Sequence, residues 1–185
     1  SAAMADLDGD GRLDLVAASE GSHTVTVWRQ WNGWERVDLG AGPHPYSLAI
    51  GDVDGNGLDL VIANPRWNSV TVLSNRIHQV PRAVDFFAKA DVEAGQAPWA
   101  LAAADLNGDW RTDLAVANRG ANTASVLLGN GDITFQPKSD YDTGVEPEEV
   151  GVGDLNADGR PDLVTADYAS NTVSVRLGRG DGTFE

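Results

Sequence analysis

The chain has 185 residues, 42% hydrophobic and 22% charged, which is an ordinary composition for a globular protein. Its net charge of -15 argues against nucleic acid as a partner, because nucleic-acid-binding domains carry a basic surface stripe. No apolar run approaches the roughly 18 residues of a membrane span, so we expect no membrane insertion. The chain has no cysteine, so thiolate metal sites and disulfides are excluded.

An acidic, glycine-rich segment occurs four times along the chain. The four segments begin at Asp6, Asp52, Asp105 and Asp154, which lie 46, 53 and 49 residues apart. Side-chain oxygens stand at segment positions 1, 3, 5 and 9, with small or turn-forming residues between them. Such a segment can curl and direct its oxygens at one point, as a hard cation requires.

This pattern of oxygen ligands is typical of a calcium site. Calcium takes about six to eight oxygen ligands, mostly carboxylates with a backbone carbonyl, and position 7 would supply the carbonyl. An EF-hand needs a bidentate Glu at position 12, where this chain has Ala17, Ala63, Val116 and Thr165. Acidic turns that only confer solubility need no acid at position 9, and four copies favour metal binding. The candidate calcium ligands are Asp6, Asp8, Asp10, Arg12 and Asp14; Asp52, Asp54, Asn56 and Asp59; Asp105, Asn107, Asp109, Arg111 and Asp113; Asp154, Asn156, Asp158, Arg160 and Asp162.

Two of the four segments depart from the common pattern. The second is one residue short, so Asp59 stands at position 8, and we expect its site to be the weakest or distorted, because the missing residue displaces the last carboxylate. The first, with four aspartates at regular spacing, should bind best. The third has Trp110 where the others have glycine.

The segments belong to repeats of about 40 to 50 residues, with approximate bounds 1–42, 43–95, 96–144 and 145–185. Each repeat shows a short apolar run into the acidic loop, a strand out of it, and two further strands. Four short antiparallel strands in a unit of this size are typical of a β-propeller blade. The strands expected in the two central repeats are 46–51, 58–63, 69–73 and about 78–87, then 99–104, 112–117, 124–128 and 133–140. Residues 80–92 are the least strand-like and could contain a helical turn.

The segments Gly151–Val164 and Val126–Phe135 resemble the FG-GAP or VCBS repeat of integrin α-subunit propellers, bacterial surface proteins and some fungal lectins. The resemblance covers the whole chain and implies an all-β propeller with metal loops between the innermost and second strands. Propellers of this kind commonly have seven blades. About four are present, and the last repeat stops before its outer strand, so we expect a segment of a larger propeller rather than a compact four-bladed ring.

Aromatic side chains are expected on the face opposite calcium. Tyr46 and Trp99 occupy the same position before an inner strand, and Trp67 and Tyr168 lie in turns between the second and third strands. Strand direction places all four away from the metal loops, where an aromatic and polar rim suits sugar rings. The alternative is that they are ordinary exposed loop residues. The tripeptide at 179–181 spells Arg-Gly-Asp, but it aligns with 130–132 and is interpreted as a tight strand connection.

The sequence does not indicate catalysis, because its three histidines lie near no nucleophile pattern and its carboxylates are mostly committed to the loops. We therefore expect a non-catalytic calcium-binding module for adhesion or carbohydrate recognition, with a glycan or an extracellular protein as its partner. Weak calcium sites fill where calcium is near millimolar, so the expected location is extracellular, at the cell surface or periplasmic. Two alternatives remain open: the propeller portion of a polysaccharide lyase or sugar dehydratase, and a structural spacer.

Overall fold

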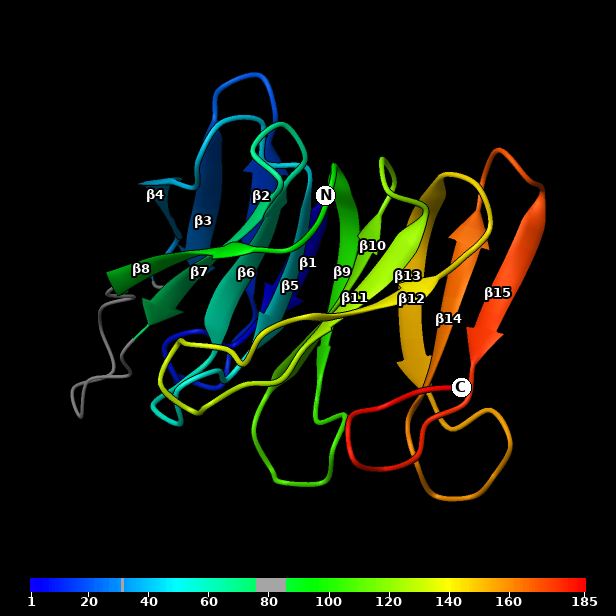
Figure 1. The fold of residues 1–185 in the computed structure, drawn as a ribbon. Coiled ribbons are helices and arrows are strands. Elements are labelled where there is room, and N and C mark those ends of the chain that lie inside the picture. The colour runs from blue at the N-terminus through cyan, green and yellow to red at the C-terminus, as the bar shows by residue number, and fades with distance from the viewer. Residues whose placement is uncertain (31, 76–85) are drawn as a thin grey trace.

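The computed structural model describes residues 1–30, 32–75 and 86–185, and every regular element in these ranges is a β-strand (Figure 1). The strands form four antiparallel sheets, which we call blades 1 to 4 in chain order. Blade 1 contains β1 (Ala2–Ala5), β2 (Asp14–Ser19), β3 (Thr24–Gln30) and β4 (Trp34–Gly40); blade 2 contains β5 (Ser47–Gly51), β6 (Asp59–Asn64), β7 (Ser69–Asn75) and β8 (Phe86–Glu93). Blade 3 contains β9 (Pro98–Ala104), β10 (Asp113–Asn118), β11 (Thr123–Leu127) and β12 (Ser139–Asp142); blade 4 contains β13 (Pro147–Gly153), β14 (Asp162–Asp167) and β15 (Thr172–Arg176). The prediction of an all-β chain built of antiparallel blades is confirmed, with three strands instead of four in blade 4.

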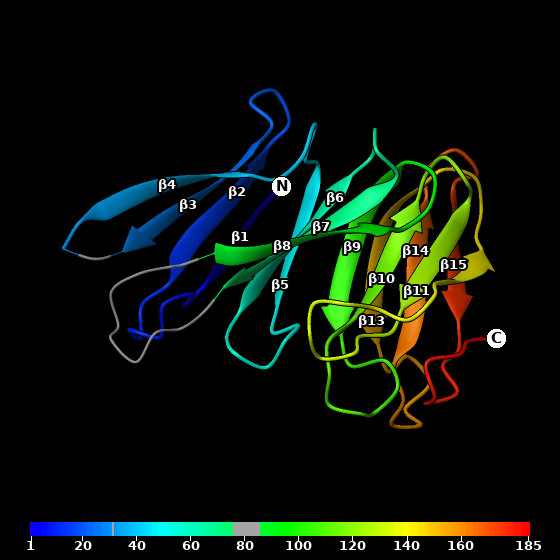
Figure 2. The same cartoon turned by 60° about the vertical axis from the view of Figure 1, so that its left-hand side comes forward.

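The four blades stand side by side in a propeller-like arc (Figures 1 and 2). The first strand of each blade is innermost, and β5 and β9 contact the inner strands on either side. Apolar side chains of neighbouring blades interlock; Val16 and Val25 of blade 1, for example, pack in one buried cluster with Leu48 and Leu60 of blade 2. Burying each such side chain contributes about 1.5 to 3 kcal/mol, so the contact between blades stabilises the fold.

Central and terminal blades differ in how much of their surface is covered. Strands β6 and β10 are buried at every residue, because a neighbouring blade lies on each of their faces. On blade 4, Leu155 is 54% exposed, whereas the equivalent Leu7, Val53 and Leu106 are at most 1% exposed. Blades 1 and 4 therefore leave their outward faces open, and the arc does not close between them in the described chain.

Two outer strands differ from the sequence prediction. In blade 2 the described outer strand is β8 (Phe86–Glu93), which overlaps the expected 78–87 at residues 86–87 and continues past it to Glu93. Residues 76–85 lie outside the described part, and the helical turn allowed within 80–92 is wrong for the described residues 86–92. In blade 3 the expected strand at 133–140 is a turn closed by the bridge between Gly129 and Phe135, followed by β12. Outer strands touch few partners, so the apolar pattern that locates inner strands is weak there.

The described residues contain no helix of the length and apolar character that crossing a membrane requires.

Candidate functional site

The acidic loops occupy one edge of the molecule, at the lower side in Figure 1. Each loop connects the inner strand of a blade to its second strand: β1 to β2, β5 to β6, β9 to β10, and β13 to β14. The first aspartate of each loop holds the loop in a curled conformation by accepting hydrogen bonds from backbone N–H groups further along it. In loop 1, Asp6 Oδ1 accepts from the Asp10 N–H at 3.1 Å and Asp6 Oδ2 from the Gly11 N–H at 2.8 Å. Glycines at positive φ, such as Gly9 (73°) and Gly11 (85°), allow this tight curvature.

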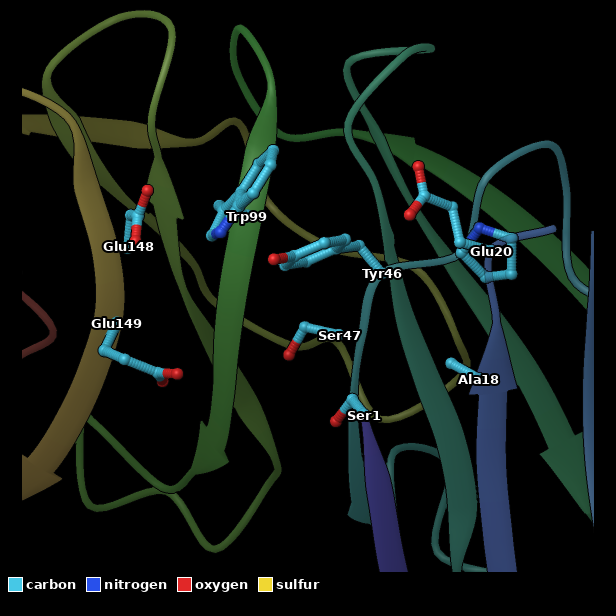
Figure 3. A pocket seen from close by; sticks show the side chains of 9 residues that line it. Ser1, Ala18, Glu20, Tyr46, Ser47, Trp99, Glu148 and Glu149 are labelled. Atoms are coloured by element: carbon cyan, nitrogen blue, oxygen red, sulfur yellow. The ribbon is translucent and has the colours of Figure 1, made fainter.

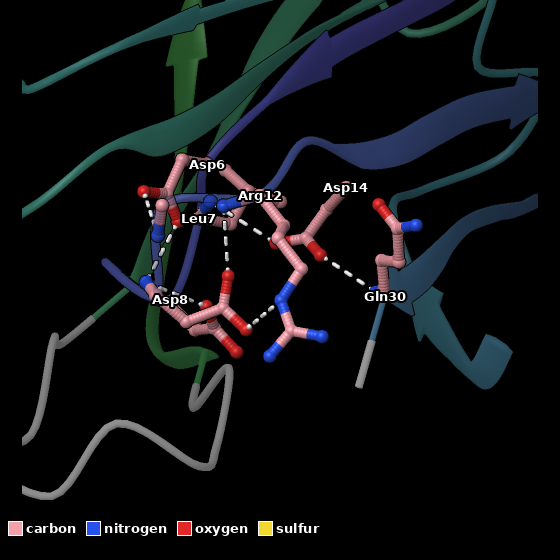
Figure 4. A network of polar contacts seen from close by, with 8 residues as sticks. Asp6, Leu7, Asp8, Arg12, Asp14 and Gln30 are labelled. Atoms are coloured by element: carbon pink, nitrogen blue, oxygen red, sulfur yellow. Dashed lines mark hydrogen bonds and ion pairs between the residues drawn. The ribbon is translucent and has the colours of Figure 1, made fainter. Parts of the chain in front are cut away.

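The last aspartate of each loop is buried and anchors the loop to its blade. In blade 1, Asp14 Oδ2 accepts from the Leu7 N–H at 3.1 Å and Asp14 Oδ1 from the Gln30 N–H at 2.9 Å (Figure 4). The matching pairs of backbone donors are Val53 and Asn75 for Asp59, Leu106 and Gly129 for Asp113, and Leu155 and Gly178 for Asp162, all at 2.7 to 2.8 Å. This carboxylate therefore joins the inner strand, the loop and the end of the third strand in all four blades.

The short second loop is not distorted at its last carboxylate. Asp59 makes the same two backbone hydrogen bonds as its counterparts and is fully buried. The expectation that the missing residue displaces Asp59 is wrong, because the missing residue is absorbed within the loop, where Gly57 has φ 149°. The carboxylate is held by the blade on both sides, so its place does not depend on the loop length.

Burial changes the acidity of these anchoring carboxylates. It raises the pKa of Asp59 to about 6, and it raises the pKa of Asp14 and Asp113 above the ordinary value. In blade 4 the pKa of Asp162 is lowered instead, chiefly by the hydrogen bond from Gly178. In blades 1 to 3, the cost of burying the charge outweighs the two backbone hydrogen bonds, so these carboxylates favour a neutralising partner.

The four loops fall into two pairs at position 3. Loops 1 and 2 carry Asp8 and Asp54, whereas loops 3 and 4 carry Asn107 and Asn156. The asparagine Nδ2 groups donate to the Oδ2 atoms of the position-5 aspartates, at 3.2 Å in loop 3 and 3.1 Å in loop 4. In loops 3 and 4, a hydrogen bond within the loop therefore replaces part of what a cation would provide to the position-5 aspartate.

Loops 1 and 2 fit a hard cation by the chemistry and placement of their donors. Carboxylate oxygens of Asp6, Asp8 and Asp14 lie within 4.8 Å of one another, and so do those of Asp52, Asp54 and Asp59. Within the described residues, Asp8 Oδ2 and Asn56 Oδ1 are buried without a hydrogen-bond partner. A buried polar oxygen without a partner costs free energy, which a bound cation would offset. The donors are all oxygens, as calcium prefers.

A pocket of about 370 Å³ lies at the opposite ends of the inner strands (Figure 3). It is lined by residues of all four blades: Ser1, Ala18, Glu20, Pro45, Tyr46, Ser47, Trp99, Glu148 and Glu149. The Tyr46 and Trp99 rings lie 4.0 Å apart at 41° and form one wall. Because the inner strands run from this pocket to the acidic loops, the pocket and the loops occupy opposite edges.

Some of the charged groups around the aromatic pair form ion pairs, and one carboxylate does not. The Arg119 guanidinium lies 4.9 Å from the centre of the Trp99 ring and pairs with Glu146 at 2.6 Å and Glu148 at 3.0 Å. The Glu149 carboxylate makes no hydrogen bond or ion pair with the residues that the structure describes, and Figure 3 shows it directed into the pocket. The pocket therefore presents an aromatic wall beside a free carboxylate.

The predicted aromatic site is assembled only in part. Tyr46 and Trp99 come together in the pocket. Trp67 and Tyr168 lie in the turns after β6 and β14, 64% and 66% exposed, and are not among the residues that line it. The acidic lining residues Glu148 and Glu149 were not among the predicted site residues. Their positions after proline, which match those of Tyr46-Ser47 and Trp99-Ala100, are the sequence signal that could have found them.

Several solved structures are similar to the chain in fold. A lectin of Agrocybe aegerita, described as recognising non-reducing terminal N-acetylglucosamine, is 23% identical with a TM-score of 0.63, covering 100% of this chain and 50% of the lectin. The Vibrio cholerae biofilm matrix protein Bap1 is 20% identical, with a TM-score of 0.60, over 100% of this chain and 27% of its own. The BBS1N chain of a complex with ARL6DN is 15% identical, with a TM-score of 0.60, over 100% and 54%. The chain thus spans 27% to 54% of the length of these structures.

A search among curated proteins gives no match. A family model described as FG-GAP-like repeat matches residues 6–59 and 105–165, which is more than half of the chain. The matched segments include all four acidic loops. The chain therefore belongs to the FG-GAP-like repeat family.

Proposed function

We propose that the protein is a calcium-stiffened β-propeller module that binds a saccharide in an adhesive role, through the pocket opposite the acidic loops. The observation that carries this proposal is the Tyr46 and Trp99 pair, whose rings lie 4.0 Å apart on the wall of a cavity of about 370 Å³. Aromatic rings accept the apolar face of a sugar, and neighbouring polar groups bind its hydroxyls.

Calcium has a structural role in this proposal. The ligands are the loop residues named above, with the position-7 carbonyls of Arg12, Arg111 and Arg160 completing three of the sites. A cation in a loop ties the end of one inner strand to the second strand of its blade. The pocket is formed by the other ends of the same inner strands, so calcium holds the spacing of its walls without touching the ligand.

The charge of the pocket restricts the saccharide. Glu20 Oε1 lies 3.5 Å from His44 Nδ1 and Glu148 pairs with Arg119, whereas the Glu149 carboxylate has no ion-pair partner in the described chain. A free carboxylate accepts hydrogen bonds from sugar hydroxyls and repels a uronic acid. We therefore propose neutral glycans as ligands, and terminal N-acetylglucosamine is the first candidate because a structural relative is a lectin for it. Trp67 and Tyr168 offer further exposed surface on the same edge to a longer oligosaccharide.

The proposed setting is outside the cell, at its surface or in the periplasm, where calcium near the millimolar range fills weak sites. The proposed assembly is part of a larger propeller, of seven blades by family resemblance. The exposed Leu155 supports this assignment, because its counterparts in blades 1 to 3 are covered by the next blade. The proposed activity is binding without catalysis.

A glycan array probed in about 1 mM calcium, and again with a chelator, tests this function. Neutral glycans, led by those ending in N-acetylglucosamine, should bind in calcium, and uronic acid polymers should not. Trp99→Ala should weaken binding at least about tenfold, equivalent to about 1.4 kcal/mol. The matched control is Trp34→Ala, which removes a 61% exposed tryptophan from β4 and should leave binding unchanged.

Binding that survives a Tyr46→Ala and Trp99→Ala double change contradicts the assignment of the pocket. Absence of binding to every glycan on the array contradicts the saccharide function and favours a structural spacer. Cleavage of a uronic acid polymer by the protein would favour the enzyme alternative instead. Each outcome is read with the melting temperature of the variant, so that misfolding is recognised.

A further inference from the structure

Trp110 occupies a backbone position that suits glycine. It stands at position 6 of the third acidic loop, where the other loops have Gly11, Gly57 and Gly159. Its φ is 66°, in the left-handed region, where a bulky L-residue is strained. Its N–H donates to Asp105 Oδ2 at 2.9 Å, the same bond that Gly11 and Gly159 make with the first aspartate of their loops. Glycine would therefore serve the loop equally well.

Packing does not explain the tryptophan either. Its side chain is 94% exposed, the most exposed of the large hydrophobic residues. It gains almost no stability from burial to offset the backbone strain. Backbone strain that no packing of the side chain offsets indicates that the side chain has a function.

Trp110 lies at a second pocket, of about 360 Å³, on the same edge as the acidic loops. One wall is loop 2, with Asp52 and Asp54, and the other is formed by Trp110, Arg111 and Thr112 of loop 3. The Thr112 hydroxyl donates to the Asp52 carbonyl oxygen at 2.6 Å and fixes the two blades across this pocket. The walls are thus held by a direct hydrogen bond between the blades.

One cationic group in this pocket is free to bind a ligand. The Arg111 guanidinium makes no hydrogen bond or ion pair among residues 1–30, 32–75 and 86–185, and its positive charge helps to lower the pKa of Asp132. The Arg111 side chain lies against the turn at Gly131. Asp52 accepts from the Gly55 and Gly57 N–H groups with Oδ1, which leaves Oδ2 for the cation of its own loop. A free guanidinium therefore flanks an exposed aromatic ring.

We propose that Trp110 and Arg111 form a second saccharide site, for a neutral pyranose, between blades 2 and 3 on the calcium edge. The indole ring stacks on the apolar face of the sugar. The hydroxyl oxygens of the sugar accept hydrogen bonds from the Arg111 guanidinium. With the pocket of Tyr46 and Trp99 on the opposite edge, the module has two separate sites and can bridge two glycans.

Fluorine NMR of protein labelled with 5-fluorotryptophan tests this site in the full chain. The probes are methyl glycosides of glucose, galactose, mannose and N-acetylglucosamine, raised to about 50 mM, since a millimolar Kd is only about -4 kcal/mol. At least one glycoside should shift the Trp110 resonance in a saturable way, assigned by its loss in Trp110→Gly. The Trp99 resonance reports the other pocket independently, so failure of one site is distinguished from failure of the other.

Substitution by the residue of the sibling loops separates function from structure. Trp110→Gly removes the reporting resonance and should raise the melting temperature by roughly 2 to 4 °C, because the strain is removed. Arg111→Ala should weaken the binding at least tenfold, and Trp34→Ala should leave it unchanged. The proposal is overturned if no glycoside shifts the Trp110 resonance, including the case in which only a peptide does, or if Trp110→Gly lowers the melting temperature.

Discussion

Loops 1 and 2 differ from loops 3 and 4 although all four follow one sequence pattern. All four share the buried last aspartate with its two backbone hydrogen bonds. At position 3, however, the first pair has a carboxylate and the second pair has an amide that donates within its own loop. Three carboxylates converge in loops 1 and 2.

The difference separates two roles of acidic residues in one motif. The last aspartate is part of the fold, because it joins three segments of a blade regardless of what the loop binds. The position-3 residue sets the charge of the loop. We therefore expect loops 1 and 2 to depend on a cation, and loops 3 and 4 to keep their shape with less help from one.

The largest expected effect is on stability, from removal of a last aspartate. Asp59→Ala and Asp113→Ala each leave two backbone N–H groups without their acceptor, and should each lower the free energy of unfolding by about 3 kcal/mol. The cost should be similar in both loops and should remain with a chelator present. Denaturant unfolding measures it, with Asp142→Ala, an exposed carboxylate on β12, as a control expected within about 0.5 kcal/mol of the parent. Costs that vanish without calcium would show that the aspartate acts only through the metal.

The next effect is on calcium affinity. Asp8→Asn gives loop 1 the position-3 residue of loop 3. It should weaken calcium binding by loop 1, which we expect to be the strongest site of the protein, at least about tenfold, or about 1.4 kcal/mol. Because a ligand stabilises the folded state by mass action, the calcium-induced rise in melting temperature should shrink as well. Titration calorimetry and thermal melts measure both quantities. Asn107→Asp is the reciprocal change and should strengthen loop 3; equal affinities in all these variants would remove the distinction between the pairs.

A smaller change is expected with pH in the absence of calcium. Burial raises the folded-state pKa of Asp59 to about 6, above its unfolded value of 3.8, so the folded protein binds this proton more tightly. The calcium-free protein should therefore gain stability from Asp59 as the pH falls through 6, and lose it as the pH rises. With calcium present the proton competes with the cation, and the trend should reverse.

Melting temperatures at pH 7, 6 and 5 with chelator, compared between the parent and Asp59→Asn, measure this contribution. Asp162 provides the contrast, because its pKa is lowered. A lowered pKa gives stability that is lost only as the pH falls through a value below 3.8, so Asp162→Asn should keep the parent's dependence between pH 7 and 5. Equal pH profiles for the parent and Asp59→Asn would contradict the assignment.

The smallest expected effect concerns the internal hydrogen bonds of loop 3. Asn107→Ala removes the 3.2 Å bond from Asn107 Nδ2 to Asp109 Oδ2 and the 2.9 Å bond that Asn107 Oδ1 accepts from the Asp109 N–H. Both are exposed to water, and the change should cost about 1 kcal/mol. Asn156→Ala should behave alike in loop 4. A loss of several kcal/mol in denaturant unfolding would show that the asparagine, and not the last aspartate, holds these loops.

Much of the fold could be predicted from local pattern. Alternating apolar residues located the inner three strands of blades 2 and 3 to within two residues, because each has one or both faces buried. The outer strand β12 was misplaced and β8 continues past its predicted end, since few neighbours constrain their side chains. The face that carries Tyr46 and Trp99 followed from strand direction alone, whereas their contact with each other did not.

The sequence by itself determined the repeated unit: acidic loops with glycines at the positions of positive φ, joined to short strands of alternating polarity. These features are local, because curvature and side-chain alternation depend on neighbouring residues. The tertiary structure decided the place of Asp59, which is set by backbone donors at Val53 and Asn75 rather than by loop length. It also decided which aromatics share a pocket, because the packing of one blade on the next sets the distance between Tyr46 and Trp99 and leaves Trp67 outside the lining.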